Sequence, residues 1–346
     1  MKLPKFFGID IGKNTVKLAE VDLQSKTAQL VKLASFQTGQ GSLTTEDLNL
    51  RKDLSKRLKD GVASAKLSSK KCIVSLPEPV VFSRLLTFPA LDEKALDEAV
   101  HWNAKQYLPI PVEEVQKDYI KTGEIIVEGK KMFQILLVAA PKKIVNQVVE
   151  IFKDAELELL AIETESIASS RSIAYNYPGI GSVLVIDIGA AGTDLSIVSD
   201  GKLIFSQSLG TGSEAMTKAI MTSFSLDLVQ AEQYKVKFGL LSDQAEGKIY
   251  KTLEPVVSII LSEIIKTINF FRSKFQQATP TQILLLGDGG QLPGLTQYLT
   301  AKIGMPSQQA NLLQRLEVSN DIKKDVNQLG NIQGFGVAIG LALKTE

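Results

Sequence analysis

Two stretches of this sequence are nearly the same, and each has the pattern of a β-hairpin. Residues 7–22 and 184–198 both begin with an apolar strand that ends in Asp-Ile-Gly, at residues 10–12 and 187–189. In both, a tight turn and a second alternating strand follow. The repeat predicts two related half-molecules, each offering one carboxylate and one bare backbone turn to a shared ligand. The ligand that best suits such a pair is a nucleotide phosphate with its metal ion.

The length of the chain, 346 residues, exceeds what one hydrophobic core usually supports, so we expect an α/β protein with two lobes. Five of the 12 prolines fall within residues 77–111, which marks a change of character between the two hairpins. The units that we expect are the first lobe in 1–76, an inserted αβ domain in 77–158, a connecting element of the first lobe in 159–180, the second lobe in 181–330 with an outer part at about 210–275, and a C-terminal helix in 331–346 that returns to the first lobe.

Composition excludes several classes of function. The net charge is +1 and no basic tract is present, so nothing favours nucleic acid. Cys72 is the single cysteine, which rules out an internal disulfide and favours a reducing compartment. The N-terminus lacks a signal-peptide core, and the apolar region 256–271 is interrupted by polar residues and is typical of a buried helix. Any work at a membrane would therefore need a partner to hold the protein there.

The two Asp-Ile-Gly turns are the first candidate site. A strand that ends at glycine lets a phosphate approach the backbone closely, and Lys17 can reach a phosphate as a point charge. Asp10 and Asp187 would be hard oxygen ligands for Mg²⁺, through its water molecules. A single Asp-x-Gly is just a turn, but two in the same context are much harder to dismiss. The candidate phosphate-binding residues are Gly12, Lys13, Asn14, Thr15, Lys17, Gly189, Ala190, Ala191, Gly192 and Thr193.

Two further features follow the second hairpin. An apolar strand at 282–286 ends in the glycine cluster 287–294, whose bare backbone lets a flat ring or a sugar phosphate lie against it. The cluster has neither the Rossmann nor the Walker A spacing. Glu232 and Lys235 share one face of a predicted helix. They form either a surface ion pair or contacts to a ribose and an adenine edge.

Candidates for a catalytic base are few. His101 is the only histidine, which excludes His-based triads and multi-histidine metal sites. Glu163 and Glu165 are the carboxylates that chain order places near the floor of the site, and Glu163 is the candidate base. The alternative is that the two glutamates only mark the start of a helix. Without a strong base, the sequence predicts slow turnover of nucleotide or none.

The order of these features resembles that of the actin, Hsp70 and sugar-kinase ATPases. In this resemblance residues 10–12 and 187–189 correspond to the two phosphate loops, and 287–294 corresponds to the adenosine segment. Residues 161–163 lead into the first connecting helix, and residues 334–343 form the second. Within that superfamily the chain is similar to the PilM family of type IV pilus assembly proteins. Three stretches carry this similarity: residues 8–12 followed by 16–20, the inserted helix region that begins at 88–89 and ends at 106–109, and residues 209–232. The candidate adenosine-binding residues are Gly210, Gly212, Glu232, Lys235, Gly287, Asp288, Gly289, Gly290 and Leu292.

The resemblance implies a duplicated ribonuclease-H-like fold with an inserted SHS2-like domain, and ATP with Mg²⁺ as cofactors. It also implies a cytoplasmic scaffold beneath the inner membrane. Its partner would be the cytoplasmic N-terminal tail of a PilN-type membrane protein, held in a groove near the inserted domain, and self-association is open. The chain departs from the family at Asn103, where an acid is common, at the turn 190–192, which has few side-chain donors, and at Asp288, where glycine is common. Asp288 would repel the phosphates, face solvent or face the metal.

Two other functions on the same fold are the alternatives. A small-molecule kinase of the acetate- or sugar-kinase type would need an acidic base beside a substrate pocket. A cell-division filament protein of the FtsA type usually ends in an amphipathic membrane helix, whereas this chain ends in residues 342–346 directly after a predicted core helix.

Overall fold

The first sheet surrounds the first of the two repeated hairpins. The structure, a computed structural model, describes residues 3–24, 27–275 and 278–345. Six strands pair in the order β14-β3-β2-β1-β4-β8. β1 and β2 form the expected antiparallel hairpin, and β4 lies parallel to β1 on the other side. The strands are β1 (Phe7–Ile11), β2 (Thr15–Asp22), β3 (Gln29–Gln37), β4 (Lys71–Leu76), β8 (Glu158–Thr164) and β14 (Glu317–Val318).

The second sheet repeats this arrangement around the second hairpin. Its order is β11-β10-β9-β12-β13, with β9 and β10 antiparallel and β12 parallel to β9. The series β3-β2-β1-β4 of the first sheet therefore has its counterpart in β11-β10-β9-β12, which confirms the predicted duplication. The strands are β9 (Ser182–Ile188), β10 (Thr193–Ser199), β11 (Lys202–Leu209), β12 (Ile283–Leu286) and β13 (Ser307–Gln309).

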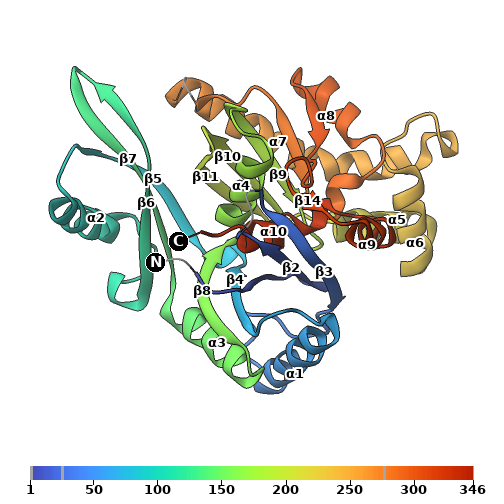
Figure 1. Cartoon of the computed structure of the whole chain (residues 1–346). Helices are drawn as coiled ribbons and strands as arrows, with labels where there is room; N and C mark the ends of the chain where they lie inside the picture. The colour runs from blue at the N-terminus through green and yellow to red at the C-terminus, as the bar shows by residue number, and fades with distance from the viewer. Residues whose placement is uncertain (1–2, 25–26, 276–277, 346) are drawn as a thin grey trace.

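A smaller antiparallel sheet, β5-β7-β6, and helix α2 (Glu93–Tyr107) lie to one side of the two lobes (Figure 1). Asp92 caps α2, because its side chain accepts a hydrogen bond from the Ala95 N–H at 2.9 Å. Val100 of the helix packs on Ile135 and Leu137 of the sheet in a core of their own. The strands are β5 (Phe82–Pro89), β6 (Val115–Val127) and β7 (Lys130–Pro141).

Helix α3 (Lys142–Asp154) falls within the expected insertion 77–158 but packs in the first lobe. Its Ile151 and Phe152 share a core with Leu54 and Leu58 of α1 (Leu48–Ala65). The two helices lie side by side under the first sheet (Figure 1). The chain therefore returns to the first lobe directly after β7, and not at β8.

Two helices lie between the sheets and join them in one core. α4 (Glu165–Asn176) follows β8, and α10 (Gly336–Ala342) returns from the C-terminal region to pack on α4, β1 and β2 (Figure 1). This contact depends on small residues. A Cβ at Gly340 would lie 1.8 Å from the Ala168 carbonyl oxygen, so only glycine permits the approach. The C-terminal helix thus returns to the first lobe.

The outer part of the second lobe is helical. α5 (Ser213–Phe224), α6 (Leu228–Phe238), α7 (Lys248–Lys274) and α8 (Leu295–Ile303) share a core with the second sheet, while α9 (Asn320–Leu329) contacts β3. The apolar residues of α7 that face this core, such as Ile264 and Phe271, are buried, as the sequence predicts for 256–271. Within the described part of the chain, no helix is both long and apolar enough to span a bilayer.

Candidate functional site

The two repeated turns have the same backbone hydrogen bond. The Gly12 N–H donates to the Thr15 carbonyl at 3.0 Å, and the Gly189 N–H donates to the Gly192 carbonyl at 2.9 Å. In both hairpins four residues therefore lie between the last paired residues, which are Ile11 and Val16 in the first and Ile188 and Thr193 in the second. In each case the aspartate lies one residue before the end of its strand, so the turn fixes its position.

The second turn packs against the first residues of α5. The N–H groups of Ser213 and Glu214 donate to the carbonyls of Gly189 and Ala190 at 2.9 and 3.0 Å. A Cβ at Gly212 would lie 2.5 Å from the Ala190 oxygen, so glycine is required for this close approach. Thr193 Oγ1 also donates to the Thr211 carbonyl, at 2.7 Å. The candidate residues of 189–193 and 210–212 are therefore in direct contact.

Glu232 and Lys235 extend this contact from helix α6. Lys235 is buried, and its Nζ donates to Thr217 Oγ1 at 2.8 Å and to the Ser213 carbonyl at 3.3 Å. Its Nζ lies 2.8 Å from Glu232 Oε2, which also accepts a hydrogen bond from Thr217. Of the two alternatives given by the sequence, the ion pair forms, and its two members differ in exposure: the Lys235 side chain is 8% exposed beside α5 and that of Glu232 is 47% exposed.

The glycine cluster after β12 lies beside the second aspartate. Leu286 is in register with Asp187, and a Cβ at Gly287 would lie 2.4 Å from Asp187 Oδ1. Gly289 is equally close to Ile188, and Gly290 and Leu292 are buried behind them. Gly210 stands apart, since a Cβ there would meet nothing within 4 Å. The structure thus joins the second turn, the glycine cluster and the start of α5 at one place, which we call the interlobe junction.

Two contacts attach the first turn to this junction. Lys17 on β2 donates to both carboxylate oxygens of Asp288 at 2.8 Å. Lys13 and Asn14 both donate to the carboxylate of Glu214 on α5. Residues that are about 200 and 271 positions apart in the chain therefore meet across the two lobes.

Carboxyl groups accumulate at the interlobe junction with little compensating charge. Burial raises the pKa of Asp10 to about 6, although the Lys17 ammonium opposes the shift. Burial and the neighbouring Asp194 and Asp10 raise the pKa of Asp187 to about 8. Burial and Glu78 raise the pKa of Asp194 to about 7. Desolvated acids with raised pKa values are typical of sites that bind a cation or move a proton.

Asp194 and Glu78 were not predicted, and Glu165 was only noted beside Glu163. Burial and the charges of Asp194 and Asp10 raise the pKa of Glu165. The Glu165 carboxylate accepts the Glu78 N–H at 3.1 Å, and the Glu78 carboxylate accepts the Ser166 N–H at 3.3 Å. A signal for Asp194 was present, because it occupies the position in the second hairpin that Lys17 occupies in the first.

The candidate base Glu163 has a different environment. Its two oxygens accept hydrogen bonds from Arg171 at 2.8 and 2.9 Å, and one of them also accepts from Lys344 at 2.7 Å. Burial alone would raise the pKa of Glu163, but these two cations outweigh it and hold the pKa below its usual value. A carboxylate with that pKa and both oxygens engaged is a poor proton acceptor. The geometry therefore argues against the base role, and Glu163 instead joins β8, α4 and the C-terminal residues.

The acids and bases present suit a magnesium nucleotide. Lys13, Lys17, Asn14 and Thr15 supply donors on the first lobe. The desolvated carboxyl groups, whose raised pKa values reflect the cost of burying their charge, would ionise beside a divalent cation. Among the described residues, no three acid, histidine or cysteine side chains are placed to hold a metal ion directly. A metal at Asp10 and Asp187 would therefore be held through water molecules and phosphate oxygens.

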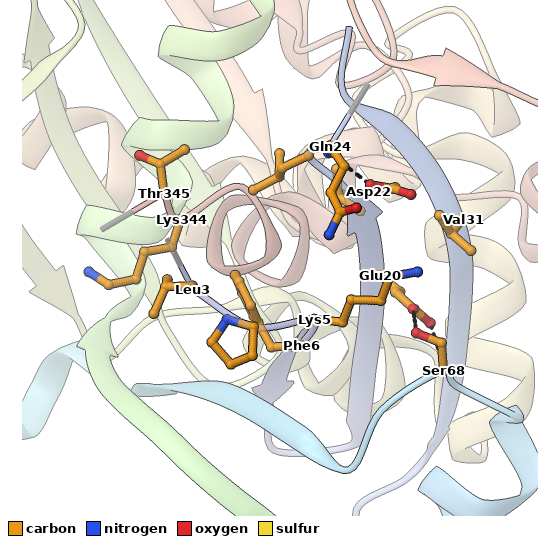
Figure 2. Close-up of a pocket in the computed structure, with 13 residues that line it drawn as sticks. Leu3, Lys5, Phe6, Glu20, Asp22, Gln24, Val31, Ser68, Lys344 and Thr345 are labelled. Atoms are coloured by element: carbon orange, nitrogen blue, oxygen red, sulfur yellow. Dashed lines mark hydrogen bonds between the residues drawn. The ribbon is translucent and has the colours of Figure 1, made fainter. Parts of the chain in front are cut away.

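A separate cavity of about 220 Å³ lies at the other end of the first sheet (Figure 2). It lies beside Phe6, at the beginning of β1, whereas Asp10 is near the end of that strand. Its lining mixes apolar residues with Glu20, whose carboxylate accepts the Ser68 N–H at 3.1 Å. None of the candidate residues from the sequence lines this cavity.

Comparison with solved structures places this architecture among actin-like proteins. A structure described as the PilM-PilN type IV pilus biogenesis complex matches with a TM-score of 0.83 at 27% sequence identity, covering 98% of both chains. The ethanolamine utilization protein EutJ from Carboxydothermus hydrogenoformans matches at 0.56 and 15% identity, covering 99% of this chain and 90% of the other. MreB 5 of Spiroplasma citri, bound to AMPPNP, matches at 0.53 and 14%, covering 98% and 95%. At these identities, the last two show the fold alone.

The family comparison covers nearly the whole chain. The family described as type IV pilus assembly protein PilM matches residues 8–346, which include both hairpins, the insertion and the C-terminal helix. The chain therefore belongs to the PilM family of type IV pilus assembly proteins.

Proposed function

We propose that this protein is an ATP-binding, actin-like scaffold of the type IV pilus assembly platform. The observation that carries the proposal is the match over residues 8–346 to the PilM family, together with the similarity over 98% of the chain to a PilM-PilN complex. That similarity supports a PilN-type partner. We infer that the segment bound is the N-terminal cytoplasmic tail of this membrane protein. A preformed groove that holds an extended peptide would recruit the scaffold to the membrane without a membrane helix of its own. The protein would then work on the cytoplasmic face of the inner membrane.

The nucleotide would occupy the interlobe junction. The turns at Gly12 and Gly189, with Lys17, would hold the phosphates. The residues around Glu232 and Lys235, with the backbone of the cluster 287–290, would hold the adenosine. Mg²⁺, when bound, would neutralise phosphate charge and be positioned by Asp10 and Asp187 through water. The support is the uncompensated acid at the junction and the nucleotide-bound state of an MreB protein with the same fold.

The geometry favours a binding role over catalysis. Arg171 and Lys344 engage Glu163, the residue that the sequence nominated as a catalytic base. A nucleotide that contacts both lobes would favour one arrangement of them, and the partner peptide would bind that arrangement. The family match favours this role over a small-molecule kinase or an FtsA-like filament protein. In domain terms, the scaffold would consist of the two lobes and the insertion around β5, β6, β7 and α2.

The test is co-purification with a peptide of a PilN-type N-terminal tail, with and without ATP and Mg²⁺. We expect the wild-type protein to bind the tail, and fluorescent ATP to bind the wild type but bind Asp187→Ala weakly. Asp53→Ala, at an exposed ion pair with Arg57, serves as the matched control. Thermal unfolding of each variant separates lost binding from lost folding. Unchanged ATP binding by Asp187→Ala would refute the nucleotide assignment, and failure to retain the tail under either condition would refute the partner assignment.

A further inference from the structure

The cations expected to bind phosphate are already paired with carboxylates of the opposite lobe. Lys17 is paired with Asp288, while Lys13 and Asn14 contact Glu214. We propose that Asp288 and Glu214 occupy the places of nucleotide phosphate groups in the ligand-free protein, and that ATP binds by displacing them. This inference rests on the proposed nucleotide site and adds its regulation. We call the two sets of contacts the interlobe latch.

The pair of Lys17 and Asp288 has the geometry of ammonium bound to an anion. Lys17 Nζ lies 2.8 Å from both oxygens of Asp288, so the carboxylate presents two acceptors, as a phosphate group does. The Lys17 side chain is only 12% exposed, whereas that of Asp288 is 50% exposed. The lysine is therefore fixed at the junction, and the aspartate is the member of the pair that is able to leave toward solvent.

Neighbouring residues hold Asp288 in this orientation. Asn331 Nδ2 donates to Asp288 Oδ1 at 2.6 Å. Asn331 is held in turn, because its Oδ1 accepts from Gln291 at 2.7 Å and from the Gly334 N–H at 3.0 Å. A Cβ at Gly334 would lie 2.1 Å from Asp288 Oδ1 and 2.5 Å from Lys17 Nζ. The backbone before α10 thus leaves room for the ion pair only because residue 334 is glycine.

Glu214 makes the second contact from the start of α5. One of its oxygens pairs with Lys13 and the other accepts from Asn14 Nδ2 at 3.1 Å. Burial would raise the pKa of Glu214, but the hydrogen bonds from Lys13 and Asn14 outweigh it and hold the pKa below its usual value. Glu214 is therefore charged at neutral pH and competes with an anionic ligand for the first turn.

The latch predicts a specific energetic consequence. Each contact is partly exposed, so each contributes only modestly to the free energy that holds the latch closed. Each contact also weakens as salt is added. A ligand that binds only after the latch opens has an apparent affinity reduced by the fraction of open protein. Removing the competing carboxylates should therefore strengthen the binding of ATP. If Asp288 instead holds the metal or the ribose, removing its charge should weaken the binding of ATP.

The experiment measures dissociation constants for Mg-ATP and for adenosine, which lacks phosphate. The variants are Asp288→Asn and Glu214→Gln, alone and together. Asp53→Asn and Glu156→Gln are matched controls, because each removes the acid of an exposed ion pair within the first lobe. We expect each variant to bind ATP about two- to fivefold more tightly, the double variant to bind at least as tightly as either single variant, and adenosine affinity and the controls to be unchanged.

The outcomes are distinguishable from a failure of the proposed function. If the wild type binds no ATP and the double variant binds none either, the nucleotide site itself is wrong. If the wild type binds ATP but the variants bind it equally or more weakly, the site stands and the latch is overturned. An equal gain for adenosine would also overturn it, because the acids would then block the site without standing in for phosphate. Thermal unfolding in the absence of ligand shows whether each variant is folded. If Asp288→Asn does not fold, Glu214→Gln still tests the proposal independently.

Discussion

In the first hairpin the residue opposite Asp10 is Lys17, whereas in the second the residue opposite Asp187 is Asp194. The two turns are otherwise alike in length, hydrogen bonding and the position of the aspartate. The pKa of Asp10 is raised to about 6 by burial against the opposing Lys17 charge, while burial and Asp194 raise that of Asp187 to about 8. One backbone motif therefore provides two different electrostatic environments.

The difference shows how two copies of one backbone motif can provide opposite charges at a shared site. The shared turn fixes where each aspartate lies, and the residue on the adjacent strand decides the local charge. Lys13 and Lys17 make the first hairpin the side that attracts anions, and Asp187 with Asp194 makes the second the side that attracts cations. A magnesium nucleotide carries both kinds of charge, so it complements the pair better than it would complement two identical hairpins.

The largest expected effect tests the packing of the second hairpin against α5. Gly212→Ala would place a Cβ 2.5 Å from the Ala190 oxygen and the Gly192 nitrogen, so the second turn and α5 would have to separate. We expect a loss of about 3 kcal/mol in the free energy of unfolding, measured by denaturant titration. Gly210→Ala is the control, because its Cβ would meet nothing within 4 Å. Equal stability of the two variants would contradict the close packing.

The next effect tests the charge of the first hairpin. Lys17→Met keeps the length of the side chain but removes its ammonium, and with it the donor that we assign to phosphate. We expect ATP to bind at least about tenfold more weakly, because hydrogen bonds to charged groups contribute about 1.5–3 kcal/mol. Lys59→Met, which breaks an ion pair with Glu156 elsewhere in the first lobe, should leave the titration unchanged. Full ATP affinity in Lys17→Met would show that the hairpins do not divide the charges as proposed.

A smaller effect tests the acid of the second hairpin through pH. The pKa of Asp194 is raised from 3.8 to about 7, so the folded state holds this proton more tightly than the unfolded state. The ligand-free wild type therefore loses stability as pH rises from about 4 to about 7. Asp194→Asn lacks this contribution, and we expect it to be more stable than the wild type by about 1 kcal/mol at pH 8 and by less at pH 5.

Thermal unfolding at the two pH values measures this difference, with Asp53→Asn as the exposed control. An advantage of the same size at both pH values would mean that Asp194 destabilises the protein by its shape and not by its charge. That result would contradict the claim that Asp194 and Lys17 give the two hairpins different electrostatic environments.

Local pattern was enough to predict most of the elements. The strands of both hairpins and the buried helix α7 follow from periodicity within a dozen or so residues. β5 was missed because it lies in the proline-rich stretch, where prolines at residues 77, 79 and 89 obscure the strand pattern. α3 was assigned to the insertion because sequence shows that a helix has an apolar face but not which core receives it.

The site was less predictable, because its decisive contacts join residues far apart in the chain. The positions of Asp10 and Asp187 could be inferred from the repeat. The pairing of Lys13 with Glu214 and of Lys17 with Asp288 depends on how the lobes meet, and no local spacing carries that information. Glu163 could not be distinguished from Glu165 by sequence, since only the fold brings Arg171 and Lys344 to one and Asp194 to the other.

The smallest expected effect compares the two turn glycines themselves. Neither Gly12 nor Gly189 has a positive φ, so alanine is allowed at both positions. A Cβ at Gly189 would have ordinary contact at 3.4 Å with the Gly192 oxygen, whereas at Gly12 it would lie 3.1 Å from the Thr15 oxygen. Alanine restricts the unfolded chain, which stabilises by about 0.4–1 kcal/mol where the folded backbone accepts it. We expect Gly189→Ala to be neutral or slightly stabilising and Gly12→Ala slightly destabilising, each within about 1 kcal/mol by denaturant titration. A large loss in both variants would mean that these glycines serve the fold. The expected result would leave close approach of a ligand as the reason that both turns begin with glycine.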